Sequence, residues 1–250
     1  MQSRPWRLAM IAAVLLLSGT AAWAEGEFYV IAGGGGAGTK ISSVPYTISA
    51  PGFYYLGGNL TYSGNGGNAI AVNEDNVTID LMGFSLSGPG ADSSALGIYM
   101  DGRANVEVRN GTMCRFARAI YEINANGNQH RVINIRVSTC GRGVTLSGKN
   151  HLIKNCSSTN NIIEGMGLDS GLITDCVVAN NGVYGIWING PGSVLRSTAH
   201  NNSFANFSFG NAVATSILVD RNSAYGGGTN YRNNAPAGSV VITANNAGTP

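Results

Sequence analysis

The sequence LIKNCSSTNNIIEGMGLDSG (residues 152–171) is followed directly by LITDCVVANNGVYGIWINGPG (residues 172–192), and the two stretches match in kind at most positions. Both contain short runs of apolar and β-branched residues, and both turn at a pair of asparagines, Asn160-Asn161 and Asn180-Asn181. The repeat length is about 20 residues, and the apolar positions alternate with a period of two. This pattern predicts a solenoid of short β-strands, because helical repeats lack such alternation.

The same strand pattern extends in both directions along the chain, with a spacing of roughly 20 to 28 residues. A unit of this length has no core of its own, so it buries its apolar side by stacking on the next unit, about 4.8 Å away. Equivalent residues should then form columns. The inward column of the strand that follows each asparagine corner is predicted to be the core, and it contains Ile70, Ile98, Ile120, Val144, Met166, Ile186 and Phe207.

The asparagine corners form a second predicted column. It contains Asn160, Asn180 and Asn201, each followed by another asparagine at 161, 181 and 202. Asparagine tolerates left-handed backbone, and its amide can hydrogen-bond its counterpart one coil away. We therefore expect a ladder of asparagine side chains in which Asn180 bonds both of its neighbours.

The run NVTIDLMGFSLSG (residues 76–88), followed by NVEVRNGT (residues 105–112), resembles the opening coils of right-handed β-helix repeat proteins of the pectin-lyase-like superfamily. The resemblance covers roughly residues 41–245. It implies an all-β fold, a single-stranded right-handed parallel β-helix of about 7–8 coils. It does not decide the activity, since that superfamily includes lyases, hydrolases, epimerases, phage tailspikes and non-enzymatic adhesins.

The first part of the chain is expected to direct export. Residues 1–24 have the pattern of a signal peptide, since Arg4 and Arg7 precede an apolar run that ends at a small-x-small cleavage site, residues 22–24. An uncleaved membrane anchor is the alternative, although the apolar run is short for a spanning helix. The mature chain should therefore begin at Glu25.

Two further parts follow. Residues 25–40 are a glycine-rich leader, and their GxGxxG match lacks a surrounding βαβ unit, so we expect a flexible segment rather than a phosphate site. Residues 41–250 are the parallel β-helix domain. Alternating apolar residues near Pro45 and Pro51 predict edge strands that cap its N-terminal end. Residues 226–250 are rich in Gly and Asn, and we expect them to cap the last coil through Val240-Val241-Ile242 and then to fray.

The charge pattern excludes some partners. The formal net charge is +2, and removal of Arg4 and Arg7 with the signal peptide brings it to zero. No basic stripe accompanies aromatic residues, so no nucleic acid is expected as a partner. No spacing of cysteines or histidines fits a metal site. We expect a secreted or periplasmic protein with no cofactor and no membrane span after processing, and with a polysaccharide or surface glycan as a candidate partner.

The cysteines leave alternatives open. Cys156 and Cys176 occupy the same column, so their Cα atoms should lie within the distance range of a disulfide. Two stacked buried thiols are the alternative, which we favour. Cys114 and Cys140 are offset by two residues from the stacked register and could pair at a corner.

A polar stripe follows the first strand of each repeat. Elimination at a uronic acid requires a cation that neutralises the sugar carboxylate and a base that takes the proton at C5. Arg109 and Lys154, near Asp80 or Asp175, are the candidate catalytic residues for this reaction. The alternative is a solvated ladder of alternating charges. To within one residue of register, the stripe contains Asp80, Arg109, Asn134, Lys154, Thr174, Arg196 and Asp220.

Some polar residues are harder to place. Known motifs of β-helix enzymes (calcium-binding Asp clusters, Gly-His-Gly, Asp-Pro-His) are missing. His130 and His151 could stack, but no carboxylate is placed beside them, so we expect surface residues. Glu122 falls in the inward column, where a carboxylate is costly unless paired, and a bulge that turns Ile123 inward is the favoured alternative. A charge ladder is expected from Arg118, Arg142 and Glu164.

The outward column of the strand after each asparagine corner carries aromatic residues. Tyr99 and Tyr121 are one coil apart, and Trp187 lies three coils further on, with small residues between. Flat rings suit the apolar C–H faces of a sugar chain, so these three residues are the candidate carbohydrate-binding residues. The alternative is that the rings only stabilise the sheet through cross-strand contacts.

Two functions remain open. An enzyme of the polysaccharide lyase, hydrolase or epimerase type should carry long loops that wall a groove. Coils of about 20 to 24 residues in the middle of this chain leave little loop for that purpose. We therefore favour an exported carbohydrate-binding, structural or adhesin-like envelope protein, with the enzyme acting on uronic-acid polymers as the alternative.

Overall fold

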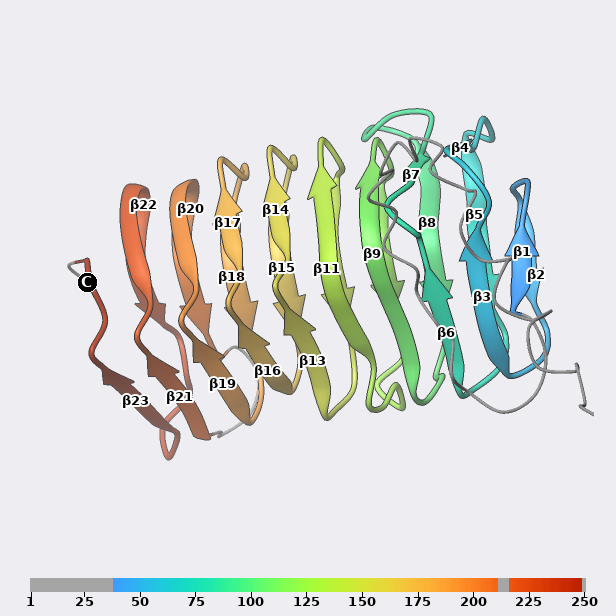
Figure 1. Ribbon diagram of the computed structural model, residues 1–250. Helices are drawn as coiled ribbons and strands as arrows, with labels where there is room; N and C mark the ends of the chain where they lie inside the picture. The colour runs from blue at the N-terminus through green and yellow to red at the C-terminus, as the bar shows by residue number, and fades with distance from the viewer. Residues whose placement is uncertain (1–37, 211–215, 249–250) are drawn as a thin grey trace, which may run out of the picture. The chain divides into compact units, whose positions relative to one another are not determined.

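The computed structural model describes residues 38–210 and 216–248, which form a parallel β-solenoid of about eight turns without a helix (Figure 1). The expected signal peptide, and the leader up to residue 37, lie outside the described residues. Strand β1 (Thr39–Ile41) begins inside the range given to the leader, so the described part of the solenoid includes residues 39 and 40. Within the described part of the chain there is no helix with the length and apolar character needed to cross a membrane.

The strands lie on three faces of the solenoid, which we call faces A, B and C. Face A contains β2 (Tyr46–Ile48), β5 (Gly66–Val72), β8 (Ser94–Met100), β10 (Arg118–Glu122), β12 (Arg142–Leu146), β15 (Glu164–Leu168) and β18 (Tyr184–Ile188). Face B contains β1 (Thr39–Ile41), β3 (Gly52–Leu56), β6 (Val77–Asp80), β13 (His151–Lys154), β16 (Gly171–Thr174), β19 (Gly192–Leu195), β21 (Ser216–Asp220) and β23 (Val240–Ala244). Face C contains β4 (Leu60–Thr61), β7 (Ser85–Ser87), β14 (Ser157–Thr159) and β17 (Val177–Ala179).

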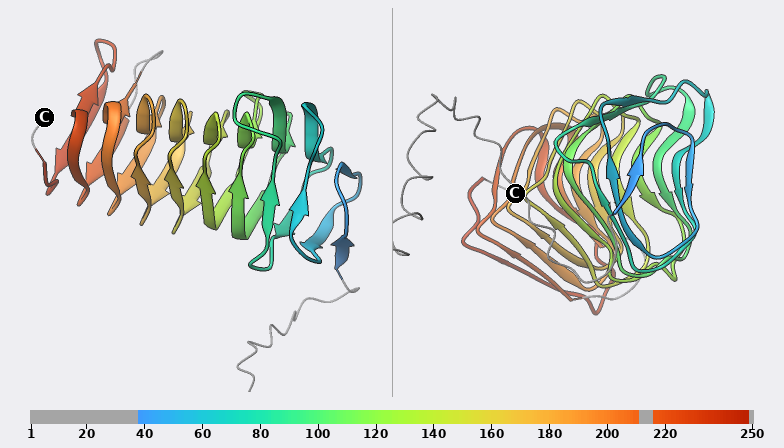
Figure 2. Two further views of the ribbon diagram at one scale, coloured as in Figure 1. Left: turned by 90° about the horizontal axis from the view of Figure 1, so that it is seen from above. Right: turned by 45° about the vertical axis from the view of Figure 1, so that its right-hand side comes forward.

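Four longer strands pass from one face to the next. Strands β9 (Val106–Cys114) and β11 (Arg131–Ser138) run from face B to face C, and β20 (Thr198–Phe209) and β22 (Ser223–Asn233) run from face C to face A. Each strand pairs in parallel with its counterpart one turn away, and Figure 2 shows the resulting stack from two further directions. The segment expected to cap the domain forms the first turn itself, since β2 pairs with β5 and β3 pairs with β6.

The core of the solenoid follows the predicted columns. On face A the pairing runs from Ile70 through Ile98, Ile120, Val144, Met166 and Ile186 to Phe207. All seven side chains are 0% exposed, so the predicted inward column is confirmed. Burial of a side chain of this size stabilises the fold by roughly 1.5–3 kcal/mol. Each coil contributes one such residue to the column. A coil is therefore stabilised by contacts with its neighbours and not by a core of its own.

The corner between faces B and C shows why this chain is rich in asparagine. Its column has positive φ, which asparagine adopts at lower cost than most residues because its short amide can hydrogen-bond locally. The column contains Asn110, Asn134, Asn155, Asp175, Arg196 and Arg221, with φ between 47° and 59°. Two members of the predicted polar stripe therefore belong to this corner. Ile133 and Leu195, not Asn134 and Arg196, pair in the strand column with Lys154 and Asp220.

The asparagine ladder exists, but the left-handed backbone and the side-chain hydrogen bonds belong to two different residues of each pair. Asn180 has φ 56° and is exposed, and its side chain forms no hydrogen bond with the part of the chain that the structure describes. The next residue, Asn181, is buried and accepts from Asn161 Nδ2 at 2.9 Å and from the Asn161 backbone N–H at 3.0 Å. Its own Nδ2 donates to Asn202 Oδ1 at 2.9 Å. The prediction that Asn180 bonds both neighbours was wrong, and Asn181 does so instead.

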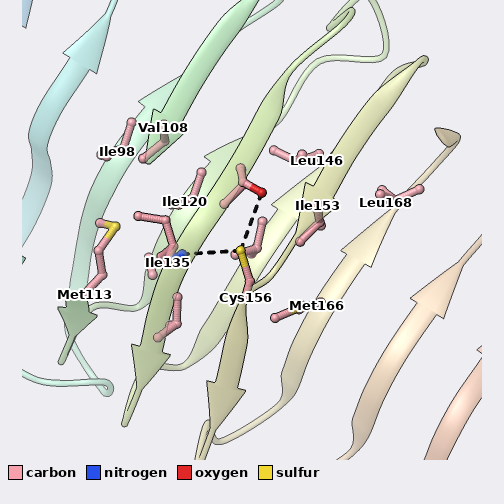
Figure 3. Packing of buried hydrophobic residues seen from close by; sticks show 14 of the residues in the cluster. Ile98, Val108, Met113, Ile120, Ile135, Leu146, Ile153, Cys156, Met166 and Leu168 are labelled. Atoms are coloured by element: carbon pink, nitrogen blue, oxygen red, sulfur yellow. Dashed lines mark hydrogen bonds between the residues drawn. The ribbon is translucent and has the colours of Figure 1, made fainter. Parts of the chain in front are cut away.

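The four cysteines are free thiols in this structure. Cys156 and Cys176 are both buried, which agrees with the favoured alternative of stacked thiols. Figure 3 shows Cys156 among the apolar core residues, where its Sγ accepts from the Ile135 N–H at 3.4 Å and donates to the Val132 carbonyl at 3.5 Å. These sulfur atoms therefore serve as polar contacts for backbone groups at a buried corner.

Candidate functional site

The outer surface of face A carries the aromatic column. Tyr99 pairs with Tyr121, Tyr121 with Thr145, Thr145 with Gly167, and Gly167 with Trp187, as the sequence register predicts. The three aromatic side chains are half-buried rather than fully exposed. Thr145 is 7% exposed, and its hydroxyl donates to Glu164 Oε1 at 3.3 Å. The column is therefore a shallow, well-supported surface with partly covered rings.

The ring geometry differs from a simple stack. The centroids of Tyr99 and Tyr121 are 6.2 Å apart and their planes are inclined by 50°, so these rings are tilted. The indole of Trp187 lies over Gly167, since a Cβ atom added at Gly167 would be 2.0 Å from Trp187 Cε2. Any side chain at position 167 would displace the indole. Trp187 thus reaches back by one coil towards the tyrosines, and only the turn with Thr145 separates its ring from Tyr121.

Charged residues flank the aromatic column on the same face. Arg118 pairs in register with Arg142, which confirms that part of the predicted charge ladder. Arg142 Nη1 lies 2.5 Å from Glu164 Oε1, and this carboxylate is almost fully buried. Arg118 instead places its guanidinium carbon 4.2 Å from the centroid of the Tyr121 ring. Within residues 38–210 and 216–248 it forms no ion pair, and its guanidinium packs on this ring instead.

A hollow lies next to Arg118. Its volume is about 460 Å³, and its lining includes the connection between β7 and β8 at residues 91–93, both arginines, and Ile162 with Ile163. That connection arches outward from the stack (Figure 1). The hollow combines two arginines, the Asp92 carboxylate, serine hydroxyl groups and an apolar wall, and such a lining can take a ligand with both polar and apolar surfaces.

The candidate catalytic residues lie on face B. Asp80 is buried, and Arg109 Nε donates to its Oδ2 at 2.8 Å. Arg109 also pairs with Glu107 at 2.9 Å. Lys154 is exposed two strands further on, because Arg109 pairs with Ile133 and Ile133 with Lys154. The structure therefore brings Asp80 and Arg109 together and leaves Lys154 at a separate position of the same column.

Asp175, the other carboxylate considered as a base, is also engaged. Arg196 donates to both of its oxygens at 2.8 and 3.0 Å. The hydrogen bond from Arg196, followed by one from Thr174, lowers the pKa of this carboxyl. Both carboxylates near the polar stripe are thus held by arginines, whereas a general base for elimination needs an accessible oxygen. The catalytic assignment stays a prediction.

A fully buried carboxylate and two buried histidines form a cluster that the sequence did not predict. Glu122 is 0% exposed and pairs in register with Met100 and Leu146, so the inward register holds and the expected bulge is wrong. Ile123 is 47% exposed. His130 and His151 are buried, not surface residues, and His130 Nε2 lies 3.1 Å from Glu122 Oε2. Their rings are stacked with centroids 5.0 Å apart.

A signal for this cluster was present in the sequence. Glu122 fell in the inward column, and the two histidines were spaced by one coil. What the sequence did not show was that the turn after β10 brings residue 130 back to residue 122. No group of three or more His, Cys, Asp or Glu side chains in the described ranges has an arrangement that could hold a metal ion.

The comparisons with known proteins are sparse. No protein-family model matches the chain, and no curated protein matches it. Among solved structures it is similar to the crystal structure of pectate lyase Pel9A, with 15% sequence identity and a TM-score of 0.48. The match covers 80% of this chain and 69% of that chain. The fold assignment rests on the strand pairing of the chain itself.

Proposed function

We propose that the protein binds a polysaccharide along the outer surface of face A, without transforming it. The observation that carries this proposal is the alignment of Tyr99, Tyr121 and Trp187 in one column beside Arg118 and the hollow. Aromatic rings offer large apolar area at low cost in conformational entropy, and sugar rings present apolar C–H faces to them. Arg118 adds donors for sugar hydroxyl or carboxylate oxygens.

The spacing of the site fits an extended ligand. Successive coils are about 4.8 Å apart, so the column from Tyr99 to Trp187 spans roughly 19 Å along the solenoid. A single small molecule would fill the hollow but leave the column uncovered. A chain of several sugar units would contact the rings and the hollow together. The site is shallow and has one arching connection, which favours binding over the enclosed geometry that catalysis requires.

A binding experiment tests this proposal. The protein starting at Glu25 retains one tryptophan, Trp187, because Trp6 and Trp23 precede it. We expect titration with polygalacturonate, alginate or a neutral β-glucan to change the Trp187 emission for at least one polymer. The Trp187→Ala variant should bind that polymer at least tenfold more weakly in calorimetry, a loss of about 1.4 kcal/mol.

The matched control is Tyr225→Ala. Tyr225 is 52% exposed and stacks on His200 in a different column, so its removal should leave the affinity unchanged. If the Trp187→Ala and Tyr225→Ala proteins bind as tightly as the parent, the ligand does not lie on this face. If none of the three polymers is bound at about millimolar concentration, the proposal for these glycans is refuted.

Elimination at a uronic acid is the second candidate function, and the exposed position of Lys154 favours a test there. We expect Lys154→Ala to lower any lyase turnover by about 10²–10³-fold, because the transition state would lose a charge that stabilises it. Its melting temperature should not change, because substitutions at the surface usually alter the free energy of unfolding by less than about 0.5 kcal/mol. Unsaturated products are followed by their ultraviolet absorbance, with Lys149→Ala as control. Turnover that survives in Lys154→Ala would place the reaction elsewhere.

We further propose that the protein is exported to the periplasm or the cell exterior, which rests on the pattern of residues 1–24. Mass spectrometry of the protein expressed with these residues should find a chain that starts at Glu25. A chain that retains residues 1–24 in the membrane fraction would support the uncleaved anchor instead.

A further inference from the structure

The buried cluster of Glu122, His130 and His151 joins two turns of the solenoid. Oε1 of Glu122 accepts the backbone N–H of Gly102 at 2.8 Å and of Asn124 at 2.7 Å. Oε2 accepts the N–H of Arg103 at 3.2 Å and lies 3.1 Å from His130 Nε2. Residues 102 and 103 follow β8, and residue 124 follows β10. One carboxylate therefore holds the turns that come directly after the strands of Tyr99 and Tyr121.

The hydrogen bonds define the tautomer of both rings. His130 Nδ1 accepts the N–H of Val106 at 3.3 Å, so the proton of a neutral ring lies on Nε2 and is donated to Glu122. His151 Nδ1 accepts the N–H of His130 at 3.2 Å, and its Nε2 donates to the Ser147 carbonyl at 3.0 Å. A proton added at Nδ1 of His151 would face the N–H of His130, so protonation of this ring has to break the network.

We propose that this network makes the Tyr99–Tyr121 end of face A sensitive to acid. A proton taken up by Glu122 weakens its hold on the turns after β8 and β10, and a proton taken up by His151 breaks the bond from the His130 N–H and so displaces the ring that donates to Glu122. The consequence for sugar binding rests on the proposed function, whereas the release of the turns does not. Loosening of these turns changes the support of both tyrosine rings from the inner side of the sheet. Binding should therefore weaken at acidic pH.

The surroundings agree with this direction. Burial, and next the neighbouring His130, lower the pKa of His151 from 6.5 to about 4. For Glu122 burial alone would raise the pKa, but the hydrogen bonds from His130 and from the three backbone N–H groups lower it. The other charged groups near the cluster are Asp169, whose Oδ2 accepts the Gly148 N–H, and Asp101, whose Oδ1 accepts from Asn124. Arg103 donates to backbone carbonyls of Asp101 and Asn73.

The sign of the effect follows from linkage. The open network takes up a proton on His151 near pH 6.5, and the closed network does so only near pH 4. The closed state is therefore fully favoured above pH 6.5 and loses its advantage as the pH falls towards 4. Between pH 7 and pH 5 the ratio of closed to open network should fall about twentyfold, given pKa values of 6.5 and about 4. The Glu122 carboxyl adds to the loss below its ordinary pKa of 4.5.

Amide hydrogen exchange measures this ratio directly. The protection factors of the Gly102, Arg103 and Asn124 N–H groups, corrected for intrinsic exchange, should fall about twentyfold from pH 7 to pH 5. The N–H of Asn181 is the internal control, because it donates to Asn202 Oδ1 and no titratable group takes part. Its protection factor should change by less than about twofold.

Two variants separate the network from general acid sensitivity. His151→Asn keeps an acceptor near the Nδ1 position and cannot be protonated, so the twentyfold fall should disappear. His200→Asn is the matched control, since His200 stacks on Tyr225 outside the network, and its protein should keep the fall. The inference is overturned if the parent protein shows no fall, or if His151→Asn shows the same fall as the parent.

Two further measurements keep the test decisive if the variant does not fold or the protein binds no polymer. If His151→Asn does not fold, the ring resonances of His151 in the parent protein decide, since a titration midpoint near 6.5 would refute a closed network. For a polymer that binds at pH 7, affinity should fall at pH 5 in the parent and stay constant in His151→Asn. A protein that binds no polymer at pH 7 refutes the proposed function alone, because the exchange data still test the network.

Discussion

Replacing Val144 with aspartate should prevent the chain from folding. Val144 is 0% exposed and pairs in register with Ile120 on one side and Met166 on the other. The substitution removes a packed side chain and places an unpaired carboxylate between two apolar coils. We expect a loss of at least about 4 kcal/mol, which is close to the whole stability of a domain at the lower end of the usual range of about 5–15 kcal/mol. Far-ultraviolet circular dichroism and thermal melting of the purified protein check this.

Ile123→Asp is the matched control for this prediction. Ile123 is 47% exposed, although a bulged register would have turned it into the core. It should tolerate the charge with a change below about 0.5 kcal/mol. If Val144→Asp melts like the parent, or Ile123→Asp is the variant that fails to fold, the register of face A is wrong at these strands.

The second large effect is expected at the buried asparagine ladder. Asn181→Ala removes the acceptor of two Asn161 N–H donors and the donor to Asn202 Oδ1, and also the bond from its Nδ2 to the Ser158 carbonyl at 3.2 Å. Four buried hydrogen bonds are then lost. The Asn161 backbone N–H loses its acceptor, whereas Asn161 Nδ2 still donates to Ser158 Oγ and Asn202 Oδ1 still accepts the backbone N–H of residue 181. At roughly 0.5–1.5 kcal/mol for each lost bond, and more for the unpaired N–H, we expect a total loss of about 3–5 kcal/mol. Denaturant unfolding measures it as a shift of the midpoint.

The neighbouring Asn180 provides the comparison. It is exposed with φ 56°, a backbone conformation that glycine adopts without strain. Asn180→Gly should therefore change the free energy of unfolding by less than about 0.5 kcal/mol, whereas Asn181→Gly should lose as much as the alanine variant. Equal losses at positions 180 and 181 would show that backbone conformation, not the side-chain ladder, stabilises this corner.

Much of the fold follows from the sequence because in-register parallel stacking repeats the same environment in every coil. A column such as Val144, Met166 and Ile186 is visible as apolar residues at a regular spacing, and the aromatic column is found by the same alignment. Tyr99, Tyr121 and Trp187 are therefore placed correctly without coordinates. The alignment decides which residues share a column, since each partner lies directly one coil away.

Two kinds of feature depended on the tertiary structure. The first is the single-residue choice at corners, where Asn160 and Asn161 are alike in composition but only one has positive φ and only the other is buried. Sequence similarity cannot separate two adjacent asparagines, because the direction of each side chain depends on the backbone at the turn. For the same reason the sequence predicted Asn134 and Arg196 in the strand column, whereas Ile133 and Leu195 occupy it.

The second kind is contact across a turn within one coil. Glu122 and His130 are paired because the loop after β10 folds back, and His151 joins them from the next coil. A buried carboxylate is unfavourable by itself, so the sequence favoured an outward position for Glu122. In the structure Glu122 accepts from three backbone N–H groups and one imidazole. These donors lie in turns that do not follow the repeat, so the repeat pattern does not predict where they lie. The repeated sequence thus determined the columns of the solenoid, and the irregular turns, visible only in three dimensions, decided which polar groups could be buried inside it.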